Sequence, residues 1–158
     1  MQSSTDTDDK GIGAVGDVVH RFVTYWETLD WQALAELWDH AGDVTYMAPE
    51  IDDILVGWET IASHLARTRS RLVNATIEMP RSRFRLITGD VAVAIFIVRW
   101  RMQSVESDVV RETAARVTAI LRRRGSQWRI VHYMEESYFL PECAEASHFL
   151  EDLESPFR

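Results

Sequence analysis

Four long β-rich segments follow one another through the second half of this chain with only short turns between them. We expect strands over residues 75–87, 91–103, 111–123 and 127–139. Segments joined by such short connections pair with their neighbours in the antiparallel direction. The run Val-Ala-Val-Ala-Ile-Phe-Ile-Val within 91–103 is apolar on both faces, which indicates burial near the middle of the sheet. Pro80 interrupts the first segment and predicts a bulge or bend there.

The first half has helical periodicity, with apolar residues recurring at spacings of three and four. We expect helices over about 15–29, 31–38 and 58–71, a short strand over 44–48, and a loop over 50–57. Three helices followed by a long antiparallel meander make an α+β fold.

The two ends of the chain differ from this pattern. Residues 1–13 are polar and lack periodicity, so they are expected to form a flexible tail. Residues 14–158 are expected to form one domain, which is an ordinary size for a single core. A short C-terminal helix is expected to begin at Pro141.

Charge and cysteine content exclude several classes of function. The 158 residues carry 17 basic and 25 acidic side chains, a net charge of −8, which argues against a nucleic-acid partner. No apolar run is long enough for a membrane helix, and the start of the chain lacks a secretory signal pattern, so we expect no membrane partner. The single cysteine, Cys143, excludes an internal disulfide framework and suits a cytoplasmic protein.

Four local sequences carry a family resemblance. They are Trp31–Trp38 in the second helix, Val44–Pro49 in the first strand, Gly57–Ile61 at the start of the third helix, and Gly125–His132 in the last hairpin. Together they resemble the SnoaL-like branch of the nuclear transport factor 2-like superfamily, over about residues 14–139.

The resemblance implies a cone-shaped fold, in which a curved antiparallel sheet wraps around the three helices and leaves a pocket at the open end. Members of the superfamily often form dimers or trimers through the sheet, so a homodimer or homotrimer is expected. Their activities include isomerases, dehydratases, epoxide hydrolases, polyketide cyclases and lyases that act on lignin-derived diarylpropanes. Some members have no catalytic activity, so the fold alone does not give the function.

Two of the family's active-site patterns are missing from this sequence. The three ketosteroid isomerase positions fall on Ala48, Phe22 and near Val117, none of which can act as base or oxyanion donor. The epoxide hydrolase pattern needs Arg-x-Asp on one strand, and Arg99-Trp100-Arg101 lacks the aspartate.

The last strand offers two alternative sets of candidates, because successive side chains point to opposite faces. One set contains His132, whose pKa near neutrality suits a general acid or base. The other contains Tyr133 and Glu135, a donor and a carboxylate whose pKa would be raised by burial. The sequence leaves open which set faces the pocket, and His132 is equally suited to a structural or interface role.

Tyr46, on the first strand, is a candidate donor to an oxyanion or phenolate if it faces the cone. Arg116, in the strand over 111–123, could hold an anionic group if it points inward, and surface ion pairing is the alternative. The residues expected to line a substrate pocket are Phe22, Trp26, Phe96, Arg99, Trp100 and Tyr133.

The sequence has no cluster with metal-ligand spacing, no phosphate-binding loop and no dinucleotide fingerprint. We therefore expect no metal and no cofactor. The leading hypothesis is an acid–base lyase or isomerase that carries out C–C cleavage with deformylation, elimination or cyclisation. Its substrate would be a small, apolar, aromatic or phenolic molecule, such as a lignin-derived diarylpropane or a polyketide. The alternative is a non-catalytic binding or oligomerisation protein of the same fold.

Overall fold

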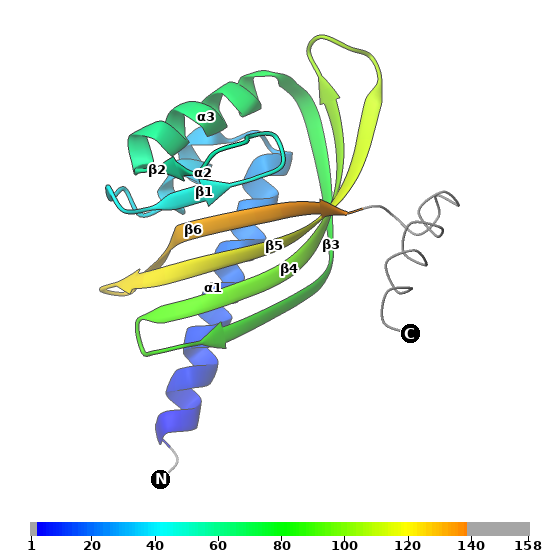
Figure 1. Cartoon of the computed structure of the whole chain (residues 1–158). Coiled ribbons are helices and arrows are strands. Elements are labelled where there is room, and N and C mark those ends of the chain that lie inside the picture. The colour runs from blue at the N-terminus through cyan, green and yellow to red at the C-terminus, as the bar shows by residue number, and fades with distance from the viewer. Residues whose placement is uncertain (1–2, 139–158) are drawn as a thin grey trace, which may run out of the picture.

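The computed structural model describes residues 3–138, which form helices packed on one face of a curved six-stranded sheet (Figure 1). The helices are α1 (Ser3–Glu27), α2 (Trp31–Glu36) and α3 (Trp58–Ser70). The strands are β1 (Thr45–Met47), β2 (Leu55–Val56), β3 (Leu72–Leu86), β4 (Val91–Ser104), β5 (Val110–Arg124) and β6 (Gln127–Tyr138). Their order in the sheet is β2-β1-β6-β5-β4-β3. The predicted α+β class and the antiparallel meander of the last four strands are confirmed.

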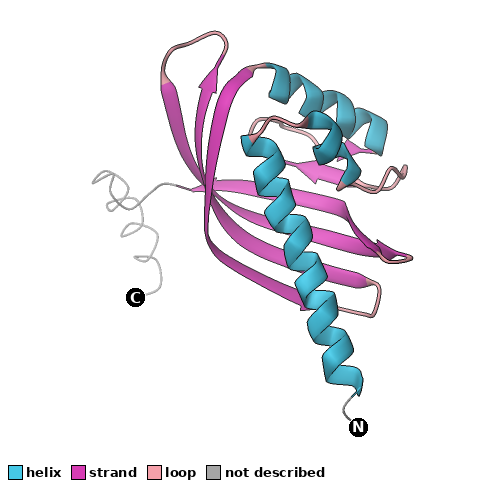
Figure 2. Ribbon diagram, turned by 180° about the vertical axis from the view of Figure 1, so that it is seen from behind, coloured by secondary structure: helices cyan, strands magenta, loops and turns pink. Residues whose placement is uncertain are grey.

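All three helices lie on the same side of the sheet, and α1 crosses the face of the long strands (Figure 2). Its apolar residues Val15, Val18, Val19 and Phe22 are buried against that face. The alternate residues of β4, from Ala92 to Trp100, are also buried. The hydrophobic core therefore fills the space between the helices and the inner face of the sheet.

Helix α1 begins twelve residues earlier than expected. Residues 3–13 are helical, so the predicted flexible tail is wrong for them. Two glycines of this helix, Gly11 in the expected tail and Gly16 in the expected helix, allow it to approach β3 closely. A Cβ at Gly11 would lie 3.1 Å from Leu86, and one at Gly16 would lie 3.2 Å from Phe84. The helix expected from Pro141 lies outside the described residues.

The sheet is not wholly antiparallel. Strand β1 pairs in the parallel direction with β6, with Tyr46 opposite Tyr133. The predicted loop over 50–57 contains the two-residue strand β2, which pairs antiparallel with β1. The connection between β1 and β2 therefore lies beside the end of β6, and it carries Glu50.

Two strands contain register shifts. Strand β3 has two, and the one between Glu78 and Arg81 confirms the irregularity predicted from Pro80. Strand β6 has one, where Ile130 lies opposite Leu121 while His132 lies opposite Ile120. Val131 is the additional residue of a β-bulge.

The bulge at Val131 changes which residues of β6 face the helices. Before it, Trp128 and Ile130 are buried; after it, Tyr133 is buried and His132 is not. An additional residue moves every later side chain to the opposite face, because the side-chain period of a strand is two. The odd-numbered residues of the second half of β6 therefore face inward.

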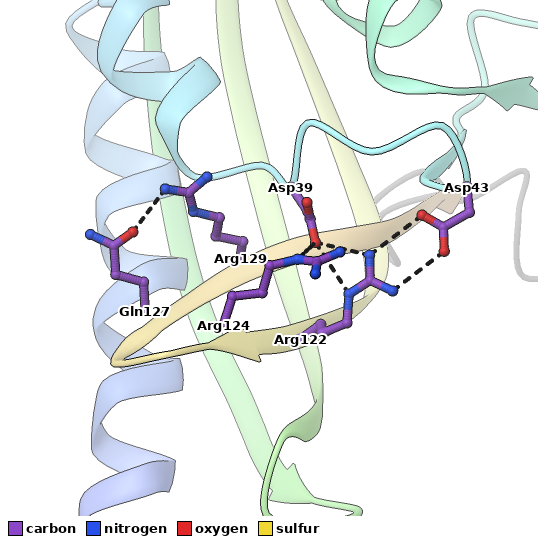
Figure 3. A network of polar contacts seen from close by, with 6 residues as sticks. All are labelled: Asp39, Asp43, Arg122, Arg124, Gln127 and Arg129. Carbon is purple, nitrogen blue, oxygen red and sulfur yellow. Dashed lines mark hydrogen bonds and ion pairs between the residues drawn. The ribbon is translucent and has the colours of Figure 1, made fainter.

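A cluster of two arginines and two aspartates ties the β5–β6 hairpin to the segment after α2 (Figure 3). Arg124 Nε donates to Asp39 Oδ2 at 2.7 Å, and Arg122 Nη2 donates to the same oxygen at 2.9 Å. Arg122 also reaches Asp43 at 3.3 Å. Burial alone would raise the pKa of Asp39, but the hydrogen bonds from Arg124 and Arg122 outweigh burial and lower it.

No helix in the described part of the chain is long and apolar enough to cross a membrane.

Candidate active site

A cavity of about 180 Å³ lies between helices α1 and α3 and the inner face of the sheet. Most of its lining is apolar or aromatic, and two carboxyl groups, Glu50 and Glu135, open onto it. The remaining lining residues are Phe22, Trp26, Tyr46, Leu65, Thr68, Leu72, Trp100, Met102 and Tyr133. Since a cavity of about 150 Å³ can hold benzene, this one has room for a single ring.

Two tyrosine–glutamate pairs form one wall. Tyr46 and Tyr133 lie opposite each other on β1 and β6, with their rings stacked at 5.3 Å between centroids. The hydroxyl of Tyr46 donates to Glu50 Oε1 at 2.8 Å, and that of Tyr133 donates to Glu135 Oε2 at 2.5 Å. The parallel pairing of β1 with β6 therefore brings two carboxyl groups to the same end of the cavity.

Glu135 has an unusual environment for a carboxyl group. Burial raises its pKa to about 7, the negative charge of Glu50 adds to the increase, and the hydrogen bond from Tyr133 opposes it. Both protonation states are populated near neutral pH. Such a group can accept a proton from one atom and return it to another.

Glu50 receives a second hydrogen bond, from α3. His64 Nε2 lies 3.0 Å from Glu50 Oε1, the same oxygen that accepts from Tyr46. The His64 side chain is largely buried, whereas the Glu50 side chain is 43% exposed. Glu50 Oε1 therefore accepts from two donors on different elements, and the rest of the side chain contacts solvent.

The two tyrosines keep their protons. Burial raises the pKa of Tyr46 and of Tyr133 well above the usual value, and the neighbouring glutamates raise both further. Each tyrosine therefore acts as a hydrogen-bond donor that positions its glutamate.

A second, more open hollow of about 620 Å³ meets the cavity at Glu135. It lies between the β1–β2 connection and the end of β6. The charged residues in its described lining are all acidic: Asp52, Asp53, Glu135 and Glu136. We call this hollow the outer groove.

Six of the ten residues expected in the site line the cavity: Phe22, Trp26, Tyr46, Trp100, Tyr133 and Glu135. Four lie elsewhere. Phe96 is buried but does not line the cavity. Arg99 is exposed on the outer face of β4.

His132 and Arg116 also lie on the outer face. His132 Nδ1 is 2.7 Å from Thr45 Oγ1, and burial among its neighbours lowers its pKa. Arg116 is 64% exposed, lies 3.9 Å from Glu136 and stacks over Tyr138. Neither side chain reaches the cavity, because the bulge at Val131 turns His132 outward and Arg116 lies opposite Glu136 on that same face.

Sequence reasoning did not single out Glu50 or His64 as residues of the site. Both belong to the site through a contact between a loop and a helix, fourteen residues apart. The available signal was the position of Glu50 directly after Pro49, at the end of the strand that carries Tyr46. Within residues 3–138, no group of three or more histidine, cysteine, aspartate or glutamate side chains could hold a metal ion.

The SnoaL-like domain family matches residues 15–139 of this sequence. The chain belongs to that family. The resemblance predicted from the four local sequences is thereby confirmed. No curated protein matches the sequence.

Many solved structures share the fold of this SnoaL-like protein. A nuclear transport factor 2-like superfamily protein from Salmonella enterica is 15% identical with a TM-score of 0.73, covering 90% of this chain and 99% of its own. A candidate scytalone dehydratase from Novosphingobium aromaticivorans is 12% identical with a TM-score of 0.76, covering 85% and 89%. A hexachlorocyclohexane dehydrochlorinase from Novosphingobium barchaimii is 20% identical with a TM-score of 0.67, covering 84% and 90%. At these identities the similarity establishes the fold.

Proposed function

We propose that this protein is a cofactor-independent lyase that eliminates a small group from a single-ring organic molecule. One observation carries the proposal. Glu135 is a largely buried carboxyl with a pKa of about 7, hydrogen-bonded to Tyr133, in an aromatic cavity that holds a second carboxyl group. A general base is most effective when its pKa lies near the working pH.

The reaction needs only one proton-transfer group. The Glu135 carboxylate removes a proton from a carbon atom, the electron pair of that C–H bond forms a C=C bond, and the adjacent bond to the leaving group breaks. Glu135 then returns the proton to a hydroxyl leaving group or, when chloride leaves as the anion, to solvent, so that the net change is loss of water or of hydrogen chloride. Tyr133 orients the carboxyl, and the charge of Glu50 keeps its proton affinity high.

Elimination is favoured over the other reactions of the family by the names of two similar structures. Dehydration and dehydrochlorination both remove a proton and an adjacent leaving group, and structures with both names share this fold. A deformylating C–C cleavage or a cyclisation would begin with the same base. A two-ring substrate such as a diarylpropane would place one ring in the cavity and extend past Glu135 into the outer groove.

The test is incubation of the purified protein, without added cofactor, with hydroxylated and chlorinated single-ring compounds. Mass spectrometry should detect loss of water or hydrogen chloride. The rate should rise with pH through about 7, because only the ionised form of Glu135 accepts the proton. If compounds of this panel bind to the protein but none of them is consumed, the result would instead support a non-catalytic binding protein.

We also propose that the protein self-associates through the outer face of the sheet. Ile95 is 51% exposed there and Met134 is 37% exposed, beside the ion pair of Arg116 with Glu136. Light scattering on the purified protein should give a dimeric or trimeric mass, and a monomeric mass would refute this.

A further inference from the structure

We propose that the cavity binds an organic cation, and specifically that the ring-bearing ligand carries a protonated amine. This inference names the ligand class of the site proposed above and rests on that assignment of the site. Its basis is that the cavity, when Glu135 is ionised, offers hydrogen-bond acceptors and aromatic faces, but no accessible free donor and no basic side chain among its described lining residues.

The donors are accounted for one by one. Tyr46 donates to Glu50, Tyr133 donates to Glu135, and Thr68 Oγ1 donates to the backbone oxygen of His64 at 3.2 Å. The indole N–H groups of Trp26 and Trp100 have no hydrogen-bond partner, but both nitrogen atoms are enclosed by protein atoms and are not accessible to a ligand. A ligand that needs a donor, such as a ketone or a carboxylate, would find none of these hydroxyl or indole protons available.

The acceptors are the carboxyl oxygens of Glu50 and Glu135. A carboxylate has lone pairs for several hydrogen bonds. Glu50 Oε1 and Glu135 Oε2 each receive the bonds described above, while the second oxygen of each group has no partner among the contacts of the described residues. A protonated amine supplies N–H donors and a positive charge to such oxygens, and charge-assisted bonds of this type are the stronger class.

The aromatic lining suits the same ligand. Five ring-bearing side chains, Phe22, Trp26, Tyr46, Trp100 and Tyr133, line the cavity. The faces of aromatic rings attract cations, most strongly where water is excluded. A neutral ligand would gain only apolar contact from these rings.

The outer groove, through which a ligand would reach the cavity, is also negatively charged. The outer groove, which meets the cavity at Glu135, has four acidic residues and no basic residue in its described lining. A recess with charges of one sign concentrates ligands of the opposite sign and accelerates their association. The groove therefore attracts cations and repels carboxylates before they reach the cavity.

The test compares three single-ring ligands of nearly equal size: benzylamine, benzyl alcohol and benzoate. They present a cation, a neutral donor and an anion on the same ring. Binding is measured by calorimetry and by the protein's tryptophan fluorescence, to which Trp26 and Trp100 in the cavity contribute. The pH is about 8, where the amine is protonated and Glu135 is mostly ionised. We expect benzylamine to bind about tenfold or more tightly than benzyl alcohol, and benzoate not to bind.

Two variants distinguish the cavity from the general negative charge of the protein. Glu135→Gln should abolish the preference for the amine. Glu112→Gln removes the same charge from an exposed residue that is paired with Arg101 and lines neither hollow, and it should leave the preference unchanged.

The inference is overturned if benzyl alcohol binds as tightly as benzylamine, if benzoate binds, if no amine binds at millimolar concentration, or if Glu135→Gln retains the preference. These outcomes are separate from those of the proposed reaction. A protein that consumes neutral substrates while rejecting the amine would keep the lyase proposal and refute this one. A protein that binds the amine and consumes none of the compounds would refute the lyase proposal and keep the preference for a cation.

Discussion

Asp39 and Glu135 are both largely buried carboxyl groups, but their surroundings shift their pKa values in opposite directions. Asp39 has two arginines on one oxygen, and their hydrogen bonds lower its pKa in spite of burial. Glu135 has a tyrosine and a second carboxylate, and burial raises its pKa to about 7. The first arrangement fixes a charge and ties a hairpin to the helical layer (Figure 3). The second leaves a proton free to move, which is what acid–base chemistry requires.

The largest expected effect is on turnover. Glu135→Gln should lower the rate of the proposed elimination by about 100-fold or more, since the amide cannot accept the proton. Steady-state kinetics on a substrate found in the elimination screen would measure it. Glu112→Gln serves as the control and should retain full activity. A Glu135→Gln variant with normal turnover would remove Glu135 from the mechanism.

The same substitution should make the protein more stable above neutral pH. In the unfolded chain the Glu135 carboxyl ionises near its ordinary pKa of 4.5, but in the folded protein it ionises at about 7. The folded state therefore binds more protons between these values, and its stability falls as pH rises through them. Allowing for partial solvent screening, Glu135→Gln should gain about 2 kcal/mol at pH above 7 and nothing near pH 4.

Urea denaturation at the two pH values measures this difference. Equal stability of the two proteins at high pH would show that the Glu135 carboxyl is well solvated, contrary to the environment described here.

The equivalent substitution at Asp39 should change the free energy of unfolding in the opposite direction. Asp39→Asn should destabilise the protein by about 2 kcal/mol, because it leaves Arg122 and Arg124 without their shared partner. This value is below that of a fully buried pair, since the arginine side chains are 29% and 56% exposed.

The effect of Asp39→Asn should depend on pH in a defined way. A lowered carboxyl pKa stabilises the fold above the unfolded value of 3.8, and that contribution is lost as pH falls through the folded pKa. The difference between the two proteins in urea denaturation should therefore shrink below about pH 4. Turnover should be unchanged near neutral pH, and a large loss of activity there would contradict a purely structural role.

The smallest effect is expected at His132. His132→Ala should change turnover less than about threefold, because its ring lies on the outer face and bonds to Thr45 rather than to the cavity. Loss of that hydrogen bond should cost about 1 kcal/mol of stability in the same denaturation experiment. A 100-fold loss of activity would instead place His132 in the chemistry, as its pKa range suggested at the level of sequence.

The order of elements could be predicted from the sequence because hydrophobic periodicity is a local property. It located α2, α3 and the four long strands, and Pro80 marked the irregularity in β3. It failed for the start of α1, where Gly11, which suggests a loop, is needed for close packing on β3. Packing of that kind depends on a partner distant in the sequence.

The candidate site was only partly predictable for a related reason. Strict alternation along β6 allows either set of side chains to face the cavity. The bulge at Val131 determines which set does so, and no residue type in the sequence predicts that bulge. The contact of His64 with Glu50 joins a helix to a loop, so hydrophobic periodicity in the sequence cannot predict it. Aromatic residues were placed better, because large apolar side chains on inward-facing positions have few alternatives to the core.

The bulge also determines how this sequence must be aligned with others. Deleting Val131 would remove the extra residue and leave a regular ladder, because the residues on either side of it already lie opposite consecutive residues of β5. Alternation along the shortened strand would still place His132 outside and Tyr133 inside, so the inner face would keep its side chains. Flattening the bulge without a deletion would instead turn Tyr133 and Glu135 outward and His132 toward the cavity. The extra codon therefore changes the spacing of the site residues in the sequence without changing the site. A relative whose β6 is regular needs a gap at this position before its inward residues match Tyr133 and Glu135.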